Sequence, residues 1–286
     1  MQARAPALPY LGYFKKIMFR IGTKIARSIH RNFGADTSVD VSESAGIRAL
    51  HLGNDTIQSA MRVRTPFELE LAYTRGMMAF LLFSDKLEQL LAIGLGGGSV
   101  PKYIYQHLPH MKTCVLEINP RVIQIARSHF YLPEDDERLR VIEGDGVVYL
   151  QQYQGVAELL MIDAFDSFGI PDAMCTQTFF DSCAEALTAD GMLAINLWGS
   201  DKNFDVYLQR IEQSFGGRTL MLPTGRPGNI VVFGFKRTPL DLRWATLRAR
   251  AKTLESSHKI EFLQFVEKLR EHNHSSDNRL LLERQS

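Results

Sequence analysis

The 286-residue chain is long enough to bury a large core, and its 45% hydrophobic content is ordinary for a globular protein. Its 33 basic and 32 acidic residues leave a formal net charge of +1, so no global field favours a nucleic-acid partner. Three cysteines without CxxC spacing are typical of reduced thiols, and we expect a cytoplasmic protein without a metal site. No apolar run is long enough to span a bilayer.

A basic segment opens the chain. Lys and Arg recur along it before the first acidic residue, Asp36, and Phe14, Met18, Ile21 and Ile25 follow helical spacing. The pattern predicts an N-terminal arm, residues 1–37, that is loose or packed on a partner. Two alternatives share this composition: an amphipathic helix in peripheral contact with an anionic membrane, and an organellar transit peptide.

Residues 38–62 alternate between apolar and polar side chains around two turn signals, Ser44-Ala45-Gly46 and Gly53-Asn54-Asp55. This pattern predicts a small antiparallel β-hairpin domain. A helix is then expected over residues 65–83, because Thr65 and Glu68 form a capping box around Pro66.

The stretch from Leu90 to Lys102 is the centre of the next domain, residues 63–236. The apolar run Leu90–Ile93 predicts a buried strand, and the glycines that follow can turn sharply and bring a ligand against bare backbone. Ser99 is expected to cap the next helix, with Pro101 in its first turn. Strand, glycine turn and helix start are the parts of a nucleotide site in an open α/β sheet.

Helices and strands alternate regularly after this loop. Helices are expected at Val100–His107, Arg121–His129, Val147–Gln152, Thr178–Leu187 and Phe204–Phe215. Strands are expected at Thr113–Ile118, Leu139–Glu143, Glu158–Ile162, Met192–Leu197, Arg218–Leu222 and Asn229–Phe235. The last two strands are too close for a helical crossover and should form an antiparallel hairpin at the sheet edge. The fold class is therefore α/β, a mostly parallel doubly wound sheet of the Rossmann-like, S-adenosylmethionine-dependent methyltransferase type.

The remaining residues, 237–286, are polar and charged and are expected to form a helical C-terminal tail. Surface helices are predicted at Trp244–Leu254 and Lys259–Leu269. A loose end is expected from His272.

Glycine spacing distinguishes two cofactor classes. Gly94, Gly96 and Gly98 read Gly-x-Gly-x-Gly, whereas a dinucleotide fingerprint would need its third glycine at Ser99. Glu117 ends the next strand about 20 residues on, where an acid can accept hydrogen bonds from ribose hydroxyls. We therefore expect an adenosyl sulfonium cofactor rather than NAD.

Acidic residues follow three successive strands, with two of them after the third strand. Because such strand ends converge on one crevice, Glu117, Asp145, Asp163 and Asp166 are expected around a single pocket with the glycine loop. Asp145, followed by Gly146, is suited to accept a hydrogen bond from the adenine amine, while Asp163 and Asp166 lie near the expected sulfonium. Taken singly, each acid is also compatible with a helix cap or a solvated loop.

Several short motifs occur between residues 47 and 235. They are Leu52-Gly53, Ile57-Gln58-Ser59, Tyr73, the glycine loop, Glu117-Ile118, Gly144-Asp145-Gly146, Asp163-x-x-Asp166 and Gly169-Ile170-Pro171. In combination they resemble the spermidine synthase (polyamine aminopropyltransferase) family. The resemblance implies a transferase of polyamine biosynthesis that moves an aminopropyl group from decarboxylated S-adenosylmethionine to an amine such as putrescine, without a metal.

The resemblance also implies roles for single residues. Asp163 would accept the proton and Asp166 would hold the amine, with Gln58 and Tyr73 shaping the substrate end and Pro171 lining the cofactor. A protonated amine cannot attack carbon, so an acid must take its proton. Family members form dimers, which suggests a homodimer here.

Three positions depart from the family pattern. Gly97 replaces an aspartate of the glycine loop, Thr74 replaces a histidine, and Arg75 replaces an acid. The amine end is therefore expected to carry less negative charge, and the acceptor is left open. The alternative functions are an S-adenosylmethionine-dependent methyltransferase and a non-catalytic nucleotide-binding homologue.

Overall fold

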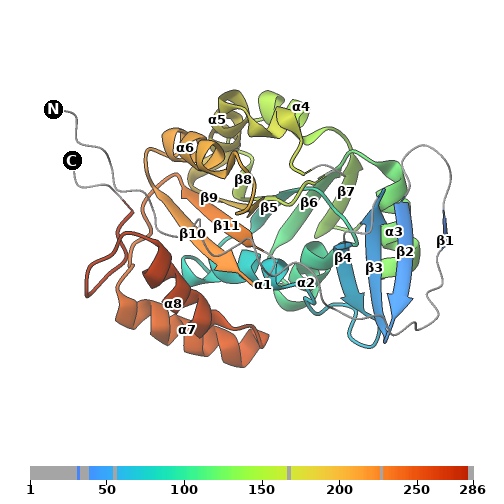
Figure 1. The fold of residues 1–286 in the computed structure, drawn as a ribbon, viewed down its shortest axis with the longest axis horizontal. Helices are drawn as coiled ribbons and strands as arrows, with labels where there is room; N and C mark the ends of the chain where they lie inside the picture. Colours follow the sequence, from blue (N-terminus) through green and yellow to red (C-terminus); the bar gives the residue numbers. More distant parts are fainter. Residues whose placement is uncertain (1–30, 33–38, 54–56, 166–168, 226–227, 283–286) are drawn as a thin grey trace.

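The computed structural model describes residues 31–32, 39–53, 57–165, 169–225 and 228–282. Within them the chain forms a small N-terminal sheet, a large central sheet with helices on both faces, and a C-terminal helical pair (Figure 1). Among these residues no helix is long and apolar enough to cross a membrane.

The N-terminal sheet is four-stranded and antiparallel, in the order β1-β2-β3-β4. Its strands are β1 (Arg31–Asn32), β2 (Val39–Ser44), β3 (Ile47–Leu52) and β4 (Ile57–Arg62). Ala45 and Gly46 turn between β2 and β3 with φ of 51° and 78°, the left-handed conformations that a tight hairpin requires. The predicted antiparallel unit is confirmed. It also pairs with β1, inside the segment that we assigned to the N-terminal arm.

The central sheet has seven strands in the order β10-β11-β9-β8-β5-β6-β7. They are β5 (Gln89–Ile93), β6 (Lys112–Glu117), β7 (Leu139–Glu143), β8 (Ala157–Ile162), β9 (Leu187–Trp198), β10 (Thr219–Thr224) and β11 (Asn229–Phe235). β5 to β9 are parallel, and β11 lies antiparallel to both β9 and β10. This order confirms the predicted fold class and the antiparallel ending.

Helices cover both faces of this sheet (Figure 1). One face carries α4 (Gly146–Gln152), η2 (Asp172–Cys175), α5 (Gln177–Ala186) and α6 (Phe204–Ser214). The other carries α1 (Ala72–Met77), η1 (Met78–Leu82), α2 (Ser99–His107), α3 (Pro120–Phe130), α7 (Trp244–His258) and α8 (Phe262–His272). The apolar strands are thus buried on both faces, which explains their lack of alternation.

The prediction of one helix over residues 65–83 is wrong. Residues 65–71 form turns, in which the amide of Glu68 donates to the carbonyl of Thr65 (3.1 Å), and α1 begins only at Ala72. Side-chain contacts from α1 explain the difference: the Arg75 guanidinium binds the carbonyl oxygens of Leu69 and Glu70 (3.2 and 2.8 Å). Those interactions hold the segment away from the helix that its capping box would start.

The C-terminal residues are packed rather than superficial. The predicted surface helices correspond to α7 and α8, which bury Trp244 and Phe262 among other side chains against the central sheet. The expected loose end from His272 is also wrong, because the amide of Leu280 donates to the carbonyl of Leu242 (3.0 Å). Apolar residues at helical spacing, masked by the polar composition, account for this burial.

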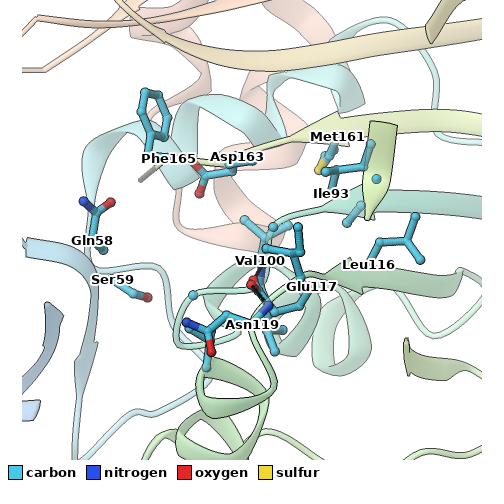
Figure 2. A pocket seen from close by; sticks show the side chains of 18 of the residues that line it. Gln58, Ser59, Ile93, Val100, Leu116, Glu117, Asn119, Met161, Asp163 and Phe165 are labelled. Carbon is cyan, nitrogen blue, oxygen red and sulfur yellow. Dashed lines mark hydrogen bonds between the residues drawn. The ribbon is translucent and has the colours of Figure 1, made fainter. Parts of the chain in front are cut away.

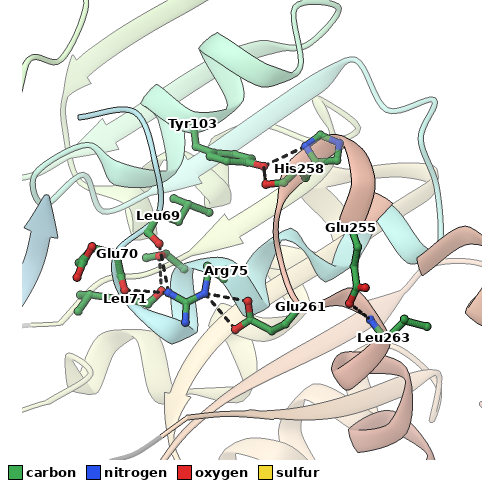
Figure 3. Close-up of polar contacts among 10 residues, drawn as sticks. Leu69, Glu70, Leu71, Arg75, Tyr103, Glu255, His258, Glu261 and Leu263 are labelled. Atoms are coloured by element: carbon green, nitrogen blue, oxygen red, sulfur yellow. Dashed lines mark hydrogen bonds and ion pairs between the residues drawn. The ribbon is translucent and has the colours of Figure 1, made fainter. Parts of the chain in front are cut away.

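Polar contacts join this C-terminal pair to the central domain (Figure 3). The Tyr103 hydroxyl on α2 lies 3.0 Å from His258 Nδ1 at the end of α7. Arg75 Nε donates to both carboxylate oxygens of Glu261 (3.0 Å each) just before α8. The pair therefore supports α1, the helix that leads into the cavity described below.

Lys102 is a buried lysine on α2. It is 0% exposed, and its Nζ donates to the carbonyl of Phe130 at the end of α3 (2.6 Å). Burial lowers the pKa of Lys102 to about 7. The unfolded chain therefore binds a proton that the folded chain lacks between pH 7 and the ordinary pKa of lysine.

We expect the free energy of unfolding of the native chain, measured relative to Lys102→Met, to rise from pH 7 to pH 9. Above pH 7 this difference in the free energy of unfolding approaches a slope of roughly 1.4 kcal/mol per pH unit. Well below pH 7 it no longer changes with pH, because the lysine is protonated in both the folded and the unfolded chain. Urea unfolding at several pH values measures it, with exposed Lys112→Met as the matched control. Parallel curves for the native chain and Lys102→Met would contradict the buried, neutral amine.

Candidate active site

One cavity of about 450 Å³ lies at the carboxyl ends of β5, β6, β7 and β8 and reaches the N-terminal sheet (Figure 2). A cavity of this size is typical of small-molecule sites. The predicted site residues that line it are Gln58, Tyr73, Gly94, Gly96, Glu117, Asp145, Gly146, Asp163 and Pro171. The parallel strands therefore bring together residues that are far apart in sequence.

Gly94 lies where the ends of β5 and β8 meet. Its φ is +91°, and a Cβ there would stand 2.3 Å from the carbonyl oxygen of Asp163. The backbone is held on both sides, since Gly94 donates to Leu116 (2.9 Å) and Asp163 donates to Ile93 (3.0 Å). Only glycine fits this close approach, which keeps one wall of the cavity as bare peptide.

The rest of the loop turns into α2. Gly96 lines the cavity with φ +53°, whereas Gly98 has φ +70° and precedes the helix as its N-cap, outside the cavity lining. The prediction that Ser99 caps α2 is wrong, because Ser99 is the first helical residue. Its hydroxyl instead lies 3.2 Å from that of Ser59, which ties the loop to β4.

Glu117 ends β6 and is buried against the loop. Its Oε2 accepts from the amide of Leu95 and its Oε1 from the amide of Asn119, each at 2.9 Å. Withdrawal from water raises the pKa of Glu117, and these backbone donors oppose the rise. The carboxylate thus fastens the glycine loop while facing the cavity.

Asp145 combines a cap with a place in the cavity lining. Its Oδ1 accepts from the amide of Val147 (2.8 Å) and caps α4. At the neighbouring Gly146, a Cβ would stand 2.6 Å from Ile93, so glycine lets α4 start against the end of β5. The helix-cap interpretation and the cavity interpretation of Asp145 are therefore compatible.

Asp163 follows β8 and faces the opposite side of the cavity (Figure 2). Asn196 Nδ2 donates to its Oδ1 (2.9 Å), and the Tyr73 hydroxyl also interacts with its carboxylate. Withdrawal from water raises the pKa of Asp163, while both donors oppose the rise. A carboxyl group with a raised pKa in a cavity is a candidate for proton transfer.

Tyr73 lies between two acceptors. Its hydroxyl is 3.2 Å from the carbonyl oxygen of Gln58 and also near Asp163, but a phenol has one proton to donate. Burial, together with the charge of Asp163, raises the pKa of Tyr73 well above its usual range. The Tyr73 hydroxyl is therefore a neutral donor that can orient the Asp163 carboxylate.

Asp166, the other acid predicted for this site, lies outside the described residues.

Sequence comparison decides the family. The family model for the spermine/spermidine synthase domain matches residues 70–215. A polyamine aminopropyltransferase of Chromobacterium violaceum is 39% identical over 244 residues, which are 85% of this chain and 94% of that protein. One from Neisseria meningitidis serogroup B is also 39% identical, over 82% of this chain and 90% of that protein. This chain belongs to the spermine/spermidine synthase family.

Solved structures agree with the fold of this spermine/spermidine synthase family member. A spermidine synthase in complex with the transition-state analogue AdoDATO has a TM-score of 0.67 at 17% identity, covering 84% of this chain and 85% of that one. Human methyltransferase-like protein 13 in complex with SAH has a TM-score of 0.59 at 23% identity, covering 72% and 96%. Both confirm the fold alone. The sequence relatives favour the predicted aminopropyltransferase over the methyltransferase alternative.

Two departures from the family pattern have structural explanations. A Cβ at Gly97 would stand 2.7 Å from the Phe130 ring and 2.9 Å from Ser59 Oγ, so an aspartate fits there only if these side chains shift. The expectation that Arg75 reduces negative charge at the amine end is wrong, because its guanidinium pairs with Glu261 outside the cavity lining (Figure 3). Thr74 does line the cavity.

Sequence reasoning missed several members of this family member's cavity. Phe165 and Asn119 line it, and Asn196 supports Asp163 from β9. Ser59 and Thr74, which belong to the motifs compared with the family, line it as well. The available signal for Asn196 was a single amide within the buried, apolar end of β9. A polar residue in such a run indicates a specific hydrogen-bonding partner.

Proposed function

We propose that the chain transfers an aminopropyl group from decarboxylated S-adenosylmethionine to an amine acceptor bound in the same cavity. The observation that carries the proposal is one cavity with Glu117 on one side and Asp163 on the other (Figure 2), where the Tyr73 hydroxyl interacts with the Asp163 carboxylate. A co-substrate with a ribose and a cationic sulfonium is complementary to carboxylates on both sides.

The end of the cavity that would hold the adenosine has the hydrogen-bond acceptors that this co-substrate requires. Each oxygen of Glu117 accepts one backbone N–H, and because a carboxylate oxygen can accept more than one hydrogen bond, capacity remains for ribose hydroxyls. Asp145 uses Oδ1 as a cap, which leaves its other oxygen for the adenine amine. Gly94, Gly96 and Gly146 would bring backbone against the nucleoside, Gly98 would set the start of α2, and Pro171 would line the same end.

The amine end supplies a proton acceptor. The co-substrate contributes an alkyl carbon activated by its sulfonium, and the chain contributes position and charge. Asp163 accepts the proton that the amine must lose before it attacks, and Tyr73 orients that carboxylate through its hydroxyl. Gln58 shapes the acceptor end from β4. The assignment of Asp166 to hold the amine stays a proposal from the family resemblance.

Three further assignments are proposals from the sequence. A cytoplasmic location follows from the three thiols, peripheral membrane contact from the basic residues 1–37, and a homodimer from the family resemblance. Residues 1–30 lie outside the described part of the chain.

Titration calorimetry with the two forms of the sulfonium compound tests the function. We expect the decarboxylated form to bind at least about tenfold more tightly, because Asp163 repels the additional carboxylate of S-adenosylmethionine. Asp163→Asn should reduce this preference. Tighter binding of the carboxylated form by the native chain would overturn the proposal in favour of methyl transfer.

A panel of di- and polyamines, putrescine included, identifies the acceptor. Release of methylthioadenosine from the decarboxylated compound reports cleavage of the carbon–sulfur bond with each amine. Cofactor binding without release for any amine would support the non-catalytic homologue instead.

A further inference from the structure

A row of three polar side chains runs from β11 through β9 to the end of β8. Asn229 Nδ2 donates to Asn196 Oδ1 (3.0 Å), and Asn196 Nδ2 donates to Asp163 Oδ1 (2.9 Å). Asn196 is only 2% exposed. A buried amide is costly unless it is hydrogen-bonded, so these two bonds explain how the strand accommodates it.

The sheet holds this row on both sides. β9 pairs with β8 through Ile195 and Ile162, and with β11 through Asn196 and Val231. The Thr224 hydroxyl donates to the carbonyl of Asn229 (3.1 Å) across the β10–β11 turn. The Asn196 amide is therefore presented to the end of β8 from a rigid position.

The row has a direction. An asparagine amide has a donating end and an accepting end, and rotation by half a turn exchanges them. Because Asn229 donates to the oxygen of Asn196, the NH₂ group of Asn196 is directed toward Asp163. A donor at this place stabilises the charged carboxylate and occupies one of its oxygens, which leaves the other oxygen for a substrate proton.

We propose that Asn196 is a positioning residue for Asp163, and that Asn229 selects the orientation in which Asn196 donates. The inference rests on the proposed role of Asp163 as proton acceptor. Among the described residues, the other titratable groups that line this cavity are Tyr73, Glu117 and Asp145. Of these, Tyr73 interacts with Asp163 directly and remains unchanged in every variant below.

The first test removes the donor. Asn196→Asp keeps the shape but places a carboxylate oxygen against Asp163, so the acidic limb of the kcat/KM profile should move upward by about one pH unit or more. We expect kcat to fall about tenfold or more, with binding of decarboxylated S-adenosylmethionine within a few-fold of native. Exposed Asn278→Asp is the matched control for the added charge.

The second test uses the direction of the row. In Asn229→Leu the Asn196 oxygen loses the hydrogen bond that fixes the orientation of its amide. In Asn229→Asp the new carboxylate instead attracts the NH₂ group of Asn196, which turns the Asn196 oxygen toward Asp163. We therefore expect a larger shift of the acidic limb for Asn229→Asp than for Asn229→Leu. A purely structural role predicts the reverse order, because the aspartate keeps the shape and a hydrogen bond.

A double-variant cycle separates orientation from charge. In an Asn196→Leu background no amide remains to turn, so Asn229→Asp should shift the limb less than it does in the native background. An equal shift in both backgrounds, or a larger shift for Asn229→Leu, would overturn the proposal. The two single Asn229 variants lie at a half-buried position and keep the test of direction available if the Asn196 variants fail to fold.

Failure of the inference is distinguishable from failure of the function. If Asp163→Asn abolishes turnover while the Asn196 and Asn229 variants leave the pH profile unmoved, the positioning role is overturned and the proton acceptor stands. If Asp163→Asn leaves turnover intact, the role of Asp163 as proton acceptor and the positioning role of Asn196 are both overturned, whereas the transfer itself stands.

Discussion

Replacing Asp163 with Asn should lower kcat by about 10²- to 10⁴-fold, the range typical for loss of a positioned proton acceptor. The substitution keeps the shape of the side chain, and its carbonyl oxygen can still accept from Asn196. Binding of decarboxylated S-adenosylmethionine should therefore stay within a few-fold of native. Product formation under single-turnover conditions measures the loss in the catalysed step, and calorimetry measures co-substrate binding separately.

The matched control is Asp172→Asn. Asp172 begins the neighbouring helix η2, is exposed, and lies outside the cavity lining, so its neutralisation should leave kcat unchanged. Unaltered turnover in Asp163→Asn would remove Asp163 from the mechanism. Equal losses in both variants would point to general electrostatics rather than proton transfer.

Replacing Gly94 with Ala should disturb both the fold and the site. The added Cβ would meet the carbonyl oxygen of Asp163 at 2.3 Å, and φ of +91° is itself unfavourable for alanine. We expect a loss of at least about 2 kcal/mol in the free energy of unfolding, together with weakened co-substrate binding. Urea unfolding and calorimetry measure these quantities.

Gly155→Ala is the control for the backbone alone. Gly155 has φ +60°, and nothing lies within 4 Å of a Cβ built there, so this variant carries the conformational cost without the clash. The difference between the two variants reports the contact between the ends of β5 and β8 together with the less favourable φ at Gly94. Equal losses of stability, with co-substrate binding intact in both, would contradict the close approach at Gly94.

Patterns that are local in sequence were sufficient to predict most strands and helices of this protein and the position of its cavity. Apolar runs separated by helical stretches predicted the strands and helices, because a strand buried on both faces must be apolar along its length. The glycine spacing and the acids that end β6 and β8 predicted the cavity, since parallel strands present their carboxyl ends at one edge. Glu117 and Asp163 could therefore be assigned to one site without coordinates.

Errors arose where side-chain contacts override a local signal or join distant parts of the chain. The capping box at Thr65 starts no helix, because Arg75 engages the carbonyl oxygens that precede α1. The same guanidinium pairs with Glu261, which is 186 positions away in sequence. No local pattern predicts such a pair, and without it Arg75 was assigned to the amine end.

The sequence by itself determined the order of the elements, the glycine loop and the acids at the strand ends, because hydrophobic periodicity and turn chemistry act between near neighbours. Only the tertiary structure decided where side chains point. It turned Ser99 toward Ser59, excluded a side chain at Gly97, and placed the Asn196 amide on Asp163. Such contacts depend on the packing of strands and helices far apart in the chain, and hydrogen bonds form only after that packing sets the distances.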